Sequence, residues 1–221
     1  MLMNVGMFAA SLLYAGAESF GLSGFTGREL SGLGAMDGYK MAFQGEWWRL
    51  LTAGFLHGNI THIMMNMLGL YQLGNEVEQV FQTPRYIAIY IFSTITGFFA
   101  SFWMRNPLSV GASAGLFGLL GALIACGVLQ RSTLGQEIKQ YYTRLAVYML
   151  LMGVLLSGAM GGATDNAAHV GGLAGGFVTA YAAGLPRAFP DWRERLWQGV
   201  AWFALALVVL SYVTWARRYV L

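Results

Sequence analysis

Long apolar runs, separated by short polar connections, make up most of this 221-residue chain. Seven segments contain no Asp, Glu, Lys or Arg: Met1–Ala17, Leu50–Asn75, Tyr86–Met104, Asn106–Gln130, Leu145–Thr164, Asn166–Pro186 and Leu196–Ala216. Each comes close to or exceeds the roughly 20 residues that a helix needs to cross a bilayer core. The pattern predicts an all-α, polytopic membrane bundle of seven helices; without the first or the last segment there would be six.

Composition supports a membrane protein and narrows its partners. The chain is 57% hydrophobic and 10% charged, which lies outside the range of soluble domains. The net charge of +3 is spread over the connections without a basic tract, so we expect no nucleic acid partner. The single cysteine, Cys126, allows neither an internal disulfide nor a cysteine metal cluster, and we expect no metal and no cofactor. The first segment has no basic leader, so we expect a retained helix and not a cleaved signal peptide.

The basic residues are distributed unevenly between alternate connections. With the N-terminus inside, the inner connections carry Arg85, Arg131, Lys139, Arg144, Arg187, Arg193 and Arg195. The outer ones carry Arg28, Lys40, Arg49 and Arg105, although Arg217 and Arg218 then also end outside. Because cytoplasmic loops are enriched in Lys and Arg, this balance favours an N-terminus on the inside.

Three polar residues stand near the beginnings of segments that run in the same direction. His62 is early in the second segment, Ser113 early in the fourth and His169 early in the sixth. They should therefore meet near one face, the external one in this orientation, about 5–10 Å below the membrane boundary. A lone serine among glycines and alanines would more often pack helices, with its hydroxyl bonded to its own backbone. A serine that meets a histidine instead indicates nucleophilic catalysis.

The surroundings of these residues add further expectations. His62 and Asn66 are four residues apart and share a helical face, where both make good donors to a developing negative charge. His57 lies nearer the loop and is expected to point away from His62. Gly172 and Gly176 share the face of His169, so a neighbouring helix should approach it at backbone distance.

Three motifs and one tryptophan–arginine pair occur in a fixed order. They are His57, His62 and Asn66 in a His-x4-His-x3-Asn pattern, Gly111-Ala112-Ser113, His169 followed by small residues, and Trp48-Arg49 in the long first connection. Together they resemble the rhomboid family of intramembrane serine proteases, over about Glu46 to Gly184. One departure is Ala114, where the family often has glycine after the serine. The segment Glu46-Trp47-Trp48-Arg49 is interpreted either as a plain aromatic anchor or as a loop lying partly in the outer leaflet.

The resemblance implies an architecture and a site. It implies one rhomboid-type membrane domain over 1–221, with a six-helix core to about 186 and an extra C-terminal transmembrane helix at about 196–216. Ser113 would be the nucleophile and His169 the general base of a dyad, because Asp165, the only nearby carboxylate, lies at the helix mouth. The oxyanion would be held by the Ser113 N–H, His62 and Asn66. Supporting residues are His57, Gly111 and Phe117, the last at a position where the family often stacks an aromatic on the histidine.

It also implies substrates and a location. The expected partners are transmembrane protein substrates, cut near the outer face, and the membrane lipid. We expect an integral protein of a bacterial inner (cell) membrane, with a mobile cap over Gly158–Asn166. Three alternatives stay open at this point: a catalytically inactive rhomboid-like scaffold that binds membrane proteins, a transporter or receptor bundle, and a bis-histidine haem or zinc site.

Overall fold

Helices dominate the computed structural model, which describes residues 1–16, 24–155, 157, 164–187 and 191–221. The long helices are α1 (Leu2–Ala15), α5 (Ile60–Trp103), α6 (Ser113–Leu129), α7 (Thr133–Leu155), α8 (Asn166–Ala183) and α9 (Trp192–Tyr219). All seven predicted segments are represented, since α5 contains the second and the third. Its backbone leaves helical geometry at Gln82 (φ 64°, ψ 159°), shortly before Pro84. The predicted cap falls mostly on 158–163, outside the described residues.

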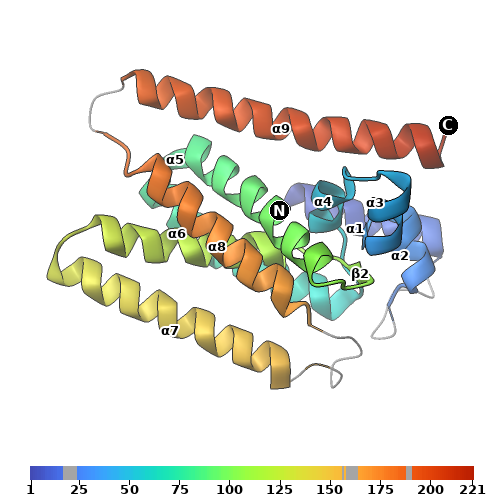
Figure 1. The fold of residues 1–221 in the computed structure, drawn as a ribbon, viewed down its shortest axis with the longest axis horizontal. Coiled ribbons are helices and arrows are strands. Elements are labelled where there is room, and N and C mark those ends of the chain that lie inside the picture. The colour runs from blue at the N-terminus through green and yellow to red at the C-terminus, as the bar shows by residue number, and fades with distance from the viewer. Residues whose placement is uncertain (17–23, 156, 158–163, 188–190) are drawn as a thin grey trace.

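The central helices are α5, α6 and α8, which pack closely on one another. In Figure 1, α9 lies along one side of this group and α7 along the opposite side, while the short N-terminal elements and the end of α9 gather at one end. By length and apolar composition, α5 and α9 are each able to cross a membrane, and α1 and α6 are shorter apolar helices. The arrangement is that of an all-α polytopic membrane protein.

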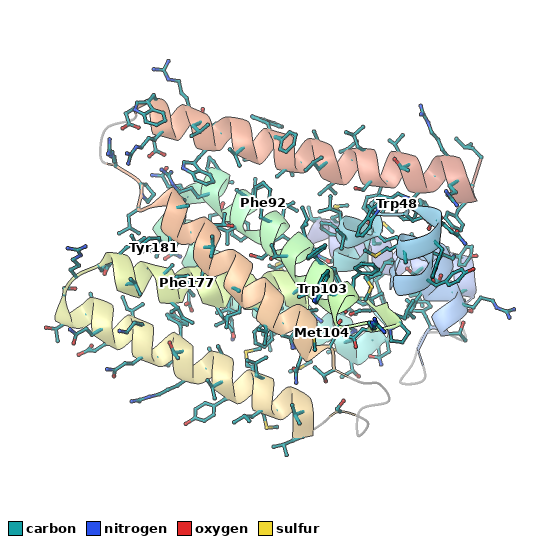
Figure 2. All side chains as sticks on the ribbon, in the orientation of Figure 1. Trp48, Phe92, Trp103, Met104, Phe177 and Tyr181 are labelled. Atoms are coloured by element: carbon teal, nitrogen blue, oxygen red, sulfur yellow. The ribbon has the colours of Figure 1, made fainter. Side chains whose placement is uncertain are left out.

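Apolar side chains project outward from the flanking helices, as Figure 2 shows for the whole described chain. The exposed large ones include Tyr148, Leu151, Trp202, Phe203 and Val209 on α7 and α9, and Trp103 at the end of α5. Backbone hydrogen bonds within helices leave few polar groups on these surfaces, which is the condition for contact with lipid. The apolar parts of these outer faces are therefore suited to hydrocarbon, whereas the first half of α7 exposes polar and charged side chains, among them Gln136, Glu137, Lys139 and Arg144.

The long first connection contains regular elements, namely α2 (Gly27–Leu33), β1 (Met36–Asp37) and α3 (Gly38–Gln44). The helix α4 (Arg49–Thr52) and the 3₁₀ turn η2 (Ala53–Phe55) follow at the beginning of the predicted second segment, whose long helix starts only at Ile60. The strand β1 pairs antiparallel with β2 (Leu108–Ser109), in the connection that precedes α6. Because β2 and the bond from the Gly111 N–H to the Ala53 carbonyl (3.0 Å) occupy this stretch, α6 begins at Ser113, seven residues later than the apolar run.

Ion pairs hold α9 near both of its ends. At one end, Arg218 Nε of α9 lies 2.6 Å from one carboxylate oxygen of Glu46, whose other oxygen accepts from Arg49 Nε (2.5 Å). The side chains of Glu46 and Arg49 are fully buried, with the phenol of Tyr219 beside them. At the other end, Arg85 forms a bidentate pair with Glu194, with distances of 2.5 and 2.8 Å. Arg49, which the sequence suggested for the membrane interface, is thus buried inside the protein. The helix α9 is attached to the rest of the bundle by ion pairs as well as by apolar packing.

Candidate active site

Ser113 and His169 are in hydrogen-bonding contact. The distance from His169 Nε2 to Ser113 Oγ is 2.9 Å. Ser113 is the first residue of α6 and His169 lies in the first turn of α8, so the parity expected from the sequence brings the two helix starts together. A hydroxyl within reach of an unprotonated imidazole nitrogen is the arrangement of an activated nucleophile.

Glycines set the separation of the two helices. A Cβ added at Gly172 would lie 2.1 Å from the carbonyl oxygen of Ala114, and one at Gly176 would lie 2.0 Å from that of Gly118. Both distances are far shorter than van der Waals contact, so only glycine fits and the backbones of α6 and α8 touch here, as the spacing of the glycines predicted. The Ser113–His169 distance therefore depends on main-chain packing.

Two groups orient the imidazole of His169. The Phe117 ring stacks on it, with centroids 4.2 Å apart and an interplanar angle of 15°. On the opposite edge, Asn166 Oδ1 lies 3.2 Å from His169 Nδ1. Asn166 was not predicted from the sequence, although its position three residues before His169 on the same helical face could have indicated it.

Asp165 has a structural task at the start of α8. Its carboxylate accepts from the Ala168 N–H (2.9 Å), which caps the helix, and from Asn106 Nδ2 (2.8 Å). It also accepts a hydrogen bond from the hydroxyl of Ser101 near the end of α5. Asp165 thus ties α8 to α5, and the atom facing His169 Nδ1 belongs to an amide.

His62 presents a donor on the other side of the serine. Its Nδ1 accepts from the Gly58 N–H (3.3 Å), which leaves the proton on Nε2. Gly111 has φ 128°, and a Cβ there would lie 2.7 Å from His62 Nε2 and 3.6 Å from Ser113 Oγ. Only glycine therefore fits between this donor and the hydroxyl. The buried Asn66 donates through Nδ2 to the His62 carbonyl (2.8 Å), on the shared face predicted for the two residues.

The expected orientation of His57 is wrong. Its ring packs edge-on against that of His62, with centroids 5.1 Å apart and an interplanar angle of 70°, and it is fully buried. His57 does lie outside the helix, since α5 begins only at Ile60, and its side chain is therefore placed by the irregular chain after η2 and not by helical periodicity. Among the residues that the structure describes, no group of three His, Cys, Asp or Glu side chains is arranged to hold a metal ion.

The start of α6 adds backbone donors. The first N–H groups of an α-helix have no acceptor within the helix, and its dipole places partial positive charge there. In α6 the carbonyl of Ala112 first pairs with the N–H of Leu116. The N–H of Ser113 precedes this bond and is one of the donors that the helix itself leaves without an acceptor. It is therefore a candidate donor to negative charge that develops on an oxygen beside Ser113.

Comparison with known proteins decides the family. The model of the rhomboid domain matches residues 44–185, which is more than half of the chain. The chain belongs to the rhomboid family. The match begins before α4 and ends just after α8, close to the range of the sequence resemblance, so the family resemblance is confirmed. The predicted extent of one domain over 1–221 stays a prediction.

Relatives of this rhomboid protein carry protease and rhomboid-like names. It is 39% identical over 169 residues to "Rhomboid protease GluP" of Bacillus subtilis (strain 168), covering 76% of this chain and 32% of that protein. It is 29% identical over 195 residues to "RHOMBOID-like protein 4" of Arabidopsis thaliana, covering 82% and 48% respectively. For "Putative rhomboid protease YdcA" of Bacillus subtilis (strain 168), identity is 30% over 148 residues, covering 65% and 71%. The matches thus span about a third and about a half of the lengths of the first two relatives.

Proposed function

We propose that this rhomboid protein is an intramembrane serine endopeptidase with Ser113 and His169 as its catalytic dyad. The observation that carries the proposal is the 2.9 Å contact between His169 Nε2 and Ser113 Oγ at the starts of two helices. The protease names of relatives support the same reaction class. A Ser–His pair without a carboxylate on the histidine is a dyad variant of the serine-hydrolase arrangement.

The dyad would act by acyl transfer. His169 Nε2 takes the proton of Ser113 as Oγ attacks the carbonyl carbon of the scissile peptide bond. The tetrahedral intermediate collapses when the C–N bond breaks, and the imidazolium returns the proton to the leaving amine. Water, deprotonated by the same nitrogen, then attacks the carbonyl carbon of the ester on Ser113, and the imidazolium returns the proton to Oγ as the C–O bond breaks. Each proton is thus taken up and returned by one nitrogen.

The oxyanion would be stabilised by three donors: the N–H of Ser113, the Nε2–H of His62 and the side-chain amide of Asn66. One such donor is typically worth about 2.7–4 kcal/mol in the transition state. The support for His62 is strongest, because its tautomer is fixed by Gly58 and its donor lies beside Gly111. Asn66 supports this position by its bond to the His62 carbonyl.

The proposed substrates are transmembrane segments of other membrane proteins. A helical carbonyl is already hydrogen-bonded, so a cleavable segment must unwind near the cut, and small or helix-breaking residues there lower the cost. The starts of α5, α6 and α8 lie at one end of the bundle (Figure 1), so the cut would fall near one membrane face. The distribution of Lys and Arg favours the exterior of the cell for this face.

Cleavage of a model transmembrane substrate by the detergent-purified chain tests the proposal. We expect the wild type to cleave, Ser113→Ala to fall to background, and Ser211→Ala, whose hydroxyl bonds to its own helix at Leu207, to match the wild type. Cleavage by Ser113→Ala at the wild-type rate would remove the nucleophile. Chelators should leave activity unchanged, and a serine-reactive probe should label the wild type only at Ser113.

An inactive rhomboid-like scaffold is the second candidate, because the curated relatives include proteins named only as rhomboid-like. It predicts substrate binding without cleavage and no labelling of Ser113. The two outcomes separate the candidates in one preparation.

A further inference from the structure

Asn166, the first residue of α8, connects the catalytic histidine to a different helix. Its Oδ1 lies 3.2 Å from His169 Nδ1, and its Nδ2 donates to the carbonyl oxygen of Leu150 on α7 (3.3 Å). The one amide side chain therefore bridges α8 and α7 at the edge of the site. In Figure 1, α7 runs along the outside of the bundle and its end approaches the start of α8.

The chemistry of this bridge fixes the direction of every hydrogen bond in it. A backbone carbonyl only accepts, so the NH₂ group of Asn166 must face Leu150 and its oxygen must face His169. An amide oxygen also only accepts, so His169 carries its proton on Nδ1. Nε2 is then left with a free lone pair, which points at the Ser113 hydroxyl.

We propose that Asn166 is a positioning residue that holds His169 in the tautomer needed for base catalysis, and that this hold depends on the position of α7. The proposal rests on the proposed role of His169. If α7 moves away, the Leu150 carbonyl no longer selects the orientation of the amide. A flipped amide would present NH₂ to Nδ1, favour the proton on Nε2 and leave no lone pair for the serine proton.

Gly153 shows how tightly α7 fits this bridge. A Cβ at Gly153 would lie 2.7 Å from Asn166 Oδ1 and 3.0 Å from the methyl group of Thr164. The missing side chain on α7 is what allows the helix to sit close enough for Leu150 to reach the amide. A methyl group there would push Asn166 or α7 outward without touching Ser113 or His169.

His62 provides an internal reference for a spectroscopic test. The Gly58 N–H donates to its Nδ1, so its proton lies on Nε2, opposite to the tautomer assigned to His169. Nitrogen-15 NMR of histidine-labelled protein at about pH 8, where an ordinary imidazole is neutral, distinguishes the two tautomers. The chain contains three histidines, so each signal is assigned by substitution.

The NMR experiment compares the wild type with two variants at position 166. We expect His169 as Nδ1–H in the wild type, a mixture of tautomers in Asn166→Ala, and retention of Nδ1–H in Asn166→Asp, which keeps an acceptor. The His62 signal should stay unchanged in both. A His169 that remains wholly Nδ1–H in Asn166→Ala would overturn the proposal, and this readout needs no activity.

Kinetics test the dependence on α7. We expect Asn166→Ala to lower kcat about tenfold with KM nearly unchanged, the effect of one lost hydrogen bond. Gly153→Ala should give a similar loss, and the double variant should be no worse than Asn166→Ala alone, because the displaced amide is absent. Gly199→Ala on α9, where a Cβ meets nothing within 4 Å, controls for the change in helix propensity and should match the wild type.

The outcomes separate this proposal from the function on which it rests. Additive losses in the double variant would overturn the coupling to α7 while the dyad stands. A wild type that cleaves nothing would remove the proposed function, and the tautomers of His169 would still decide the role of Asn166.

Discussion

Tyr219 and Glu46, 173 residues apart in the chain, are joined by a shared hydrogen bond: the phenol lies 3.0 and 3.1 Å from the two oxygens of the buried carboxylate. The same carboxylate also forms ion pairs with Arg218, at an Nε–O distance of 2.6 Å, and with Arg49, at 2.5 Å. The end of α9 therefore completes the charge balance of the first loop. The 3₁₀ turn η2, just after this loop, carries the Ala53 carbonyl that accepts from the Gly111 N–H beside the serine.

Tyr219→Phe should destabilise the protein by about 1.5–3 kcal/mol, because it removes hydrogen bonds to charged groups and leaves Glu46 less well paired. Thermal unfolding in detergent measures this. Tyr71→Phe is the matched control, since Tyr71 is 61% exposed on α5 and makes no side-chain hydrogen bond within the described part of the chain. Equal melting temperatures for the two variants would contradict the proposed importance of the α9 contact.

Gly111→Ala should abolish proteolysis with only modest loss of stability. The φ of 128° costs a side chain about 1–3 kcal/mol, and the added Cβ would lie 2.7 Å from His62 Nε2 and displace the donor. Gly45→Ala makes a suitable control: Gly45 has φ 68°, also unfavourable for alanine, but a Cβ there meets nothing within 4 Å. Cleavage assays and melting curves on both variants separate backbone strain from loss of the site. Substantial activity in Gly111→Ala would count against His62 as a donor.

Phe117→Leu should reduce kcat by about two- to tenfold, since an aromatic pair contributes about 0.5–1.5 kcal/mol beyond its buried area. The stacked ring keeps the plane of His169 fixed, and leucine would fill the space without holding that plane. Phe117→Tyr should retain most of the activity. A leucine variant with the kcat of the wild type would mean that Asn166 and the helix contact orient the imidazole without the stacked ring.

Asp37, in the first loop, is expected to make the stability of the protein depend on pH. Partial burial would raise the pKa of this carboxyl, but the Ser31 hydroxyl (2.6 Å), the Lys40 N–H (3.1 Å) and the charge of Arg49 outweigh it, and the pKa is lowered. A lowered pKa means that the stabilisation is fully present above the ordinary carboxyl range and is lost as pH falls through the lowered value. Melting temperatures measured down this range should fall more steeply for the wild type than for Asp37→Asn. Parallel curves would show that Asp37 contributes nothing to this dependence.

The sequence was sufficient to predict the pairing of Ser113 with His169 for two physical reasons. Polar groups in lipid require partners, and helices that cross in the same direction place their starts at the same face. Gly172 and Gly176 also predicted the close approach of a neighbouring helix to α8, because a helix face without side chains favours backbone contact.

What the sequence did not predict depends on irregular backbone. The residues before Ser113 are apolar enough to be helical, yet they pair as β2, so the serine starts its helix. His57 was misplaced for the same reason. Asn166 acts through the Leu150 carbonyl on another helix, and Glu46 pairs with Tyr219 at the far end of the chain. Contacts of this kind leave no periodic signal.

The contact between the α6 and α8 backbones has a consequence for how this rhomboid protein can vary. Main-chain atoms do not change with mutation, so substitutions on the outer sides of these helices leave the spacing of Ser113 and His169 unchanged. Sequence change should therefore accumulate in α7, the first loop and the bilayer-exposed surface, while the residues between α6 and α8 stay small.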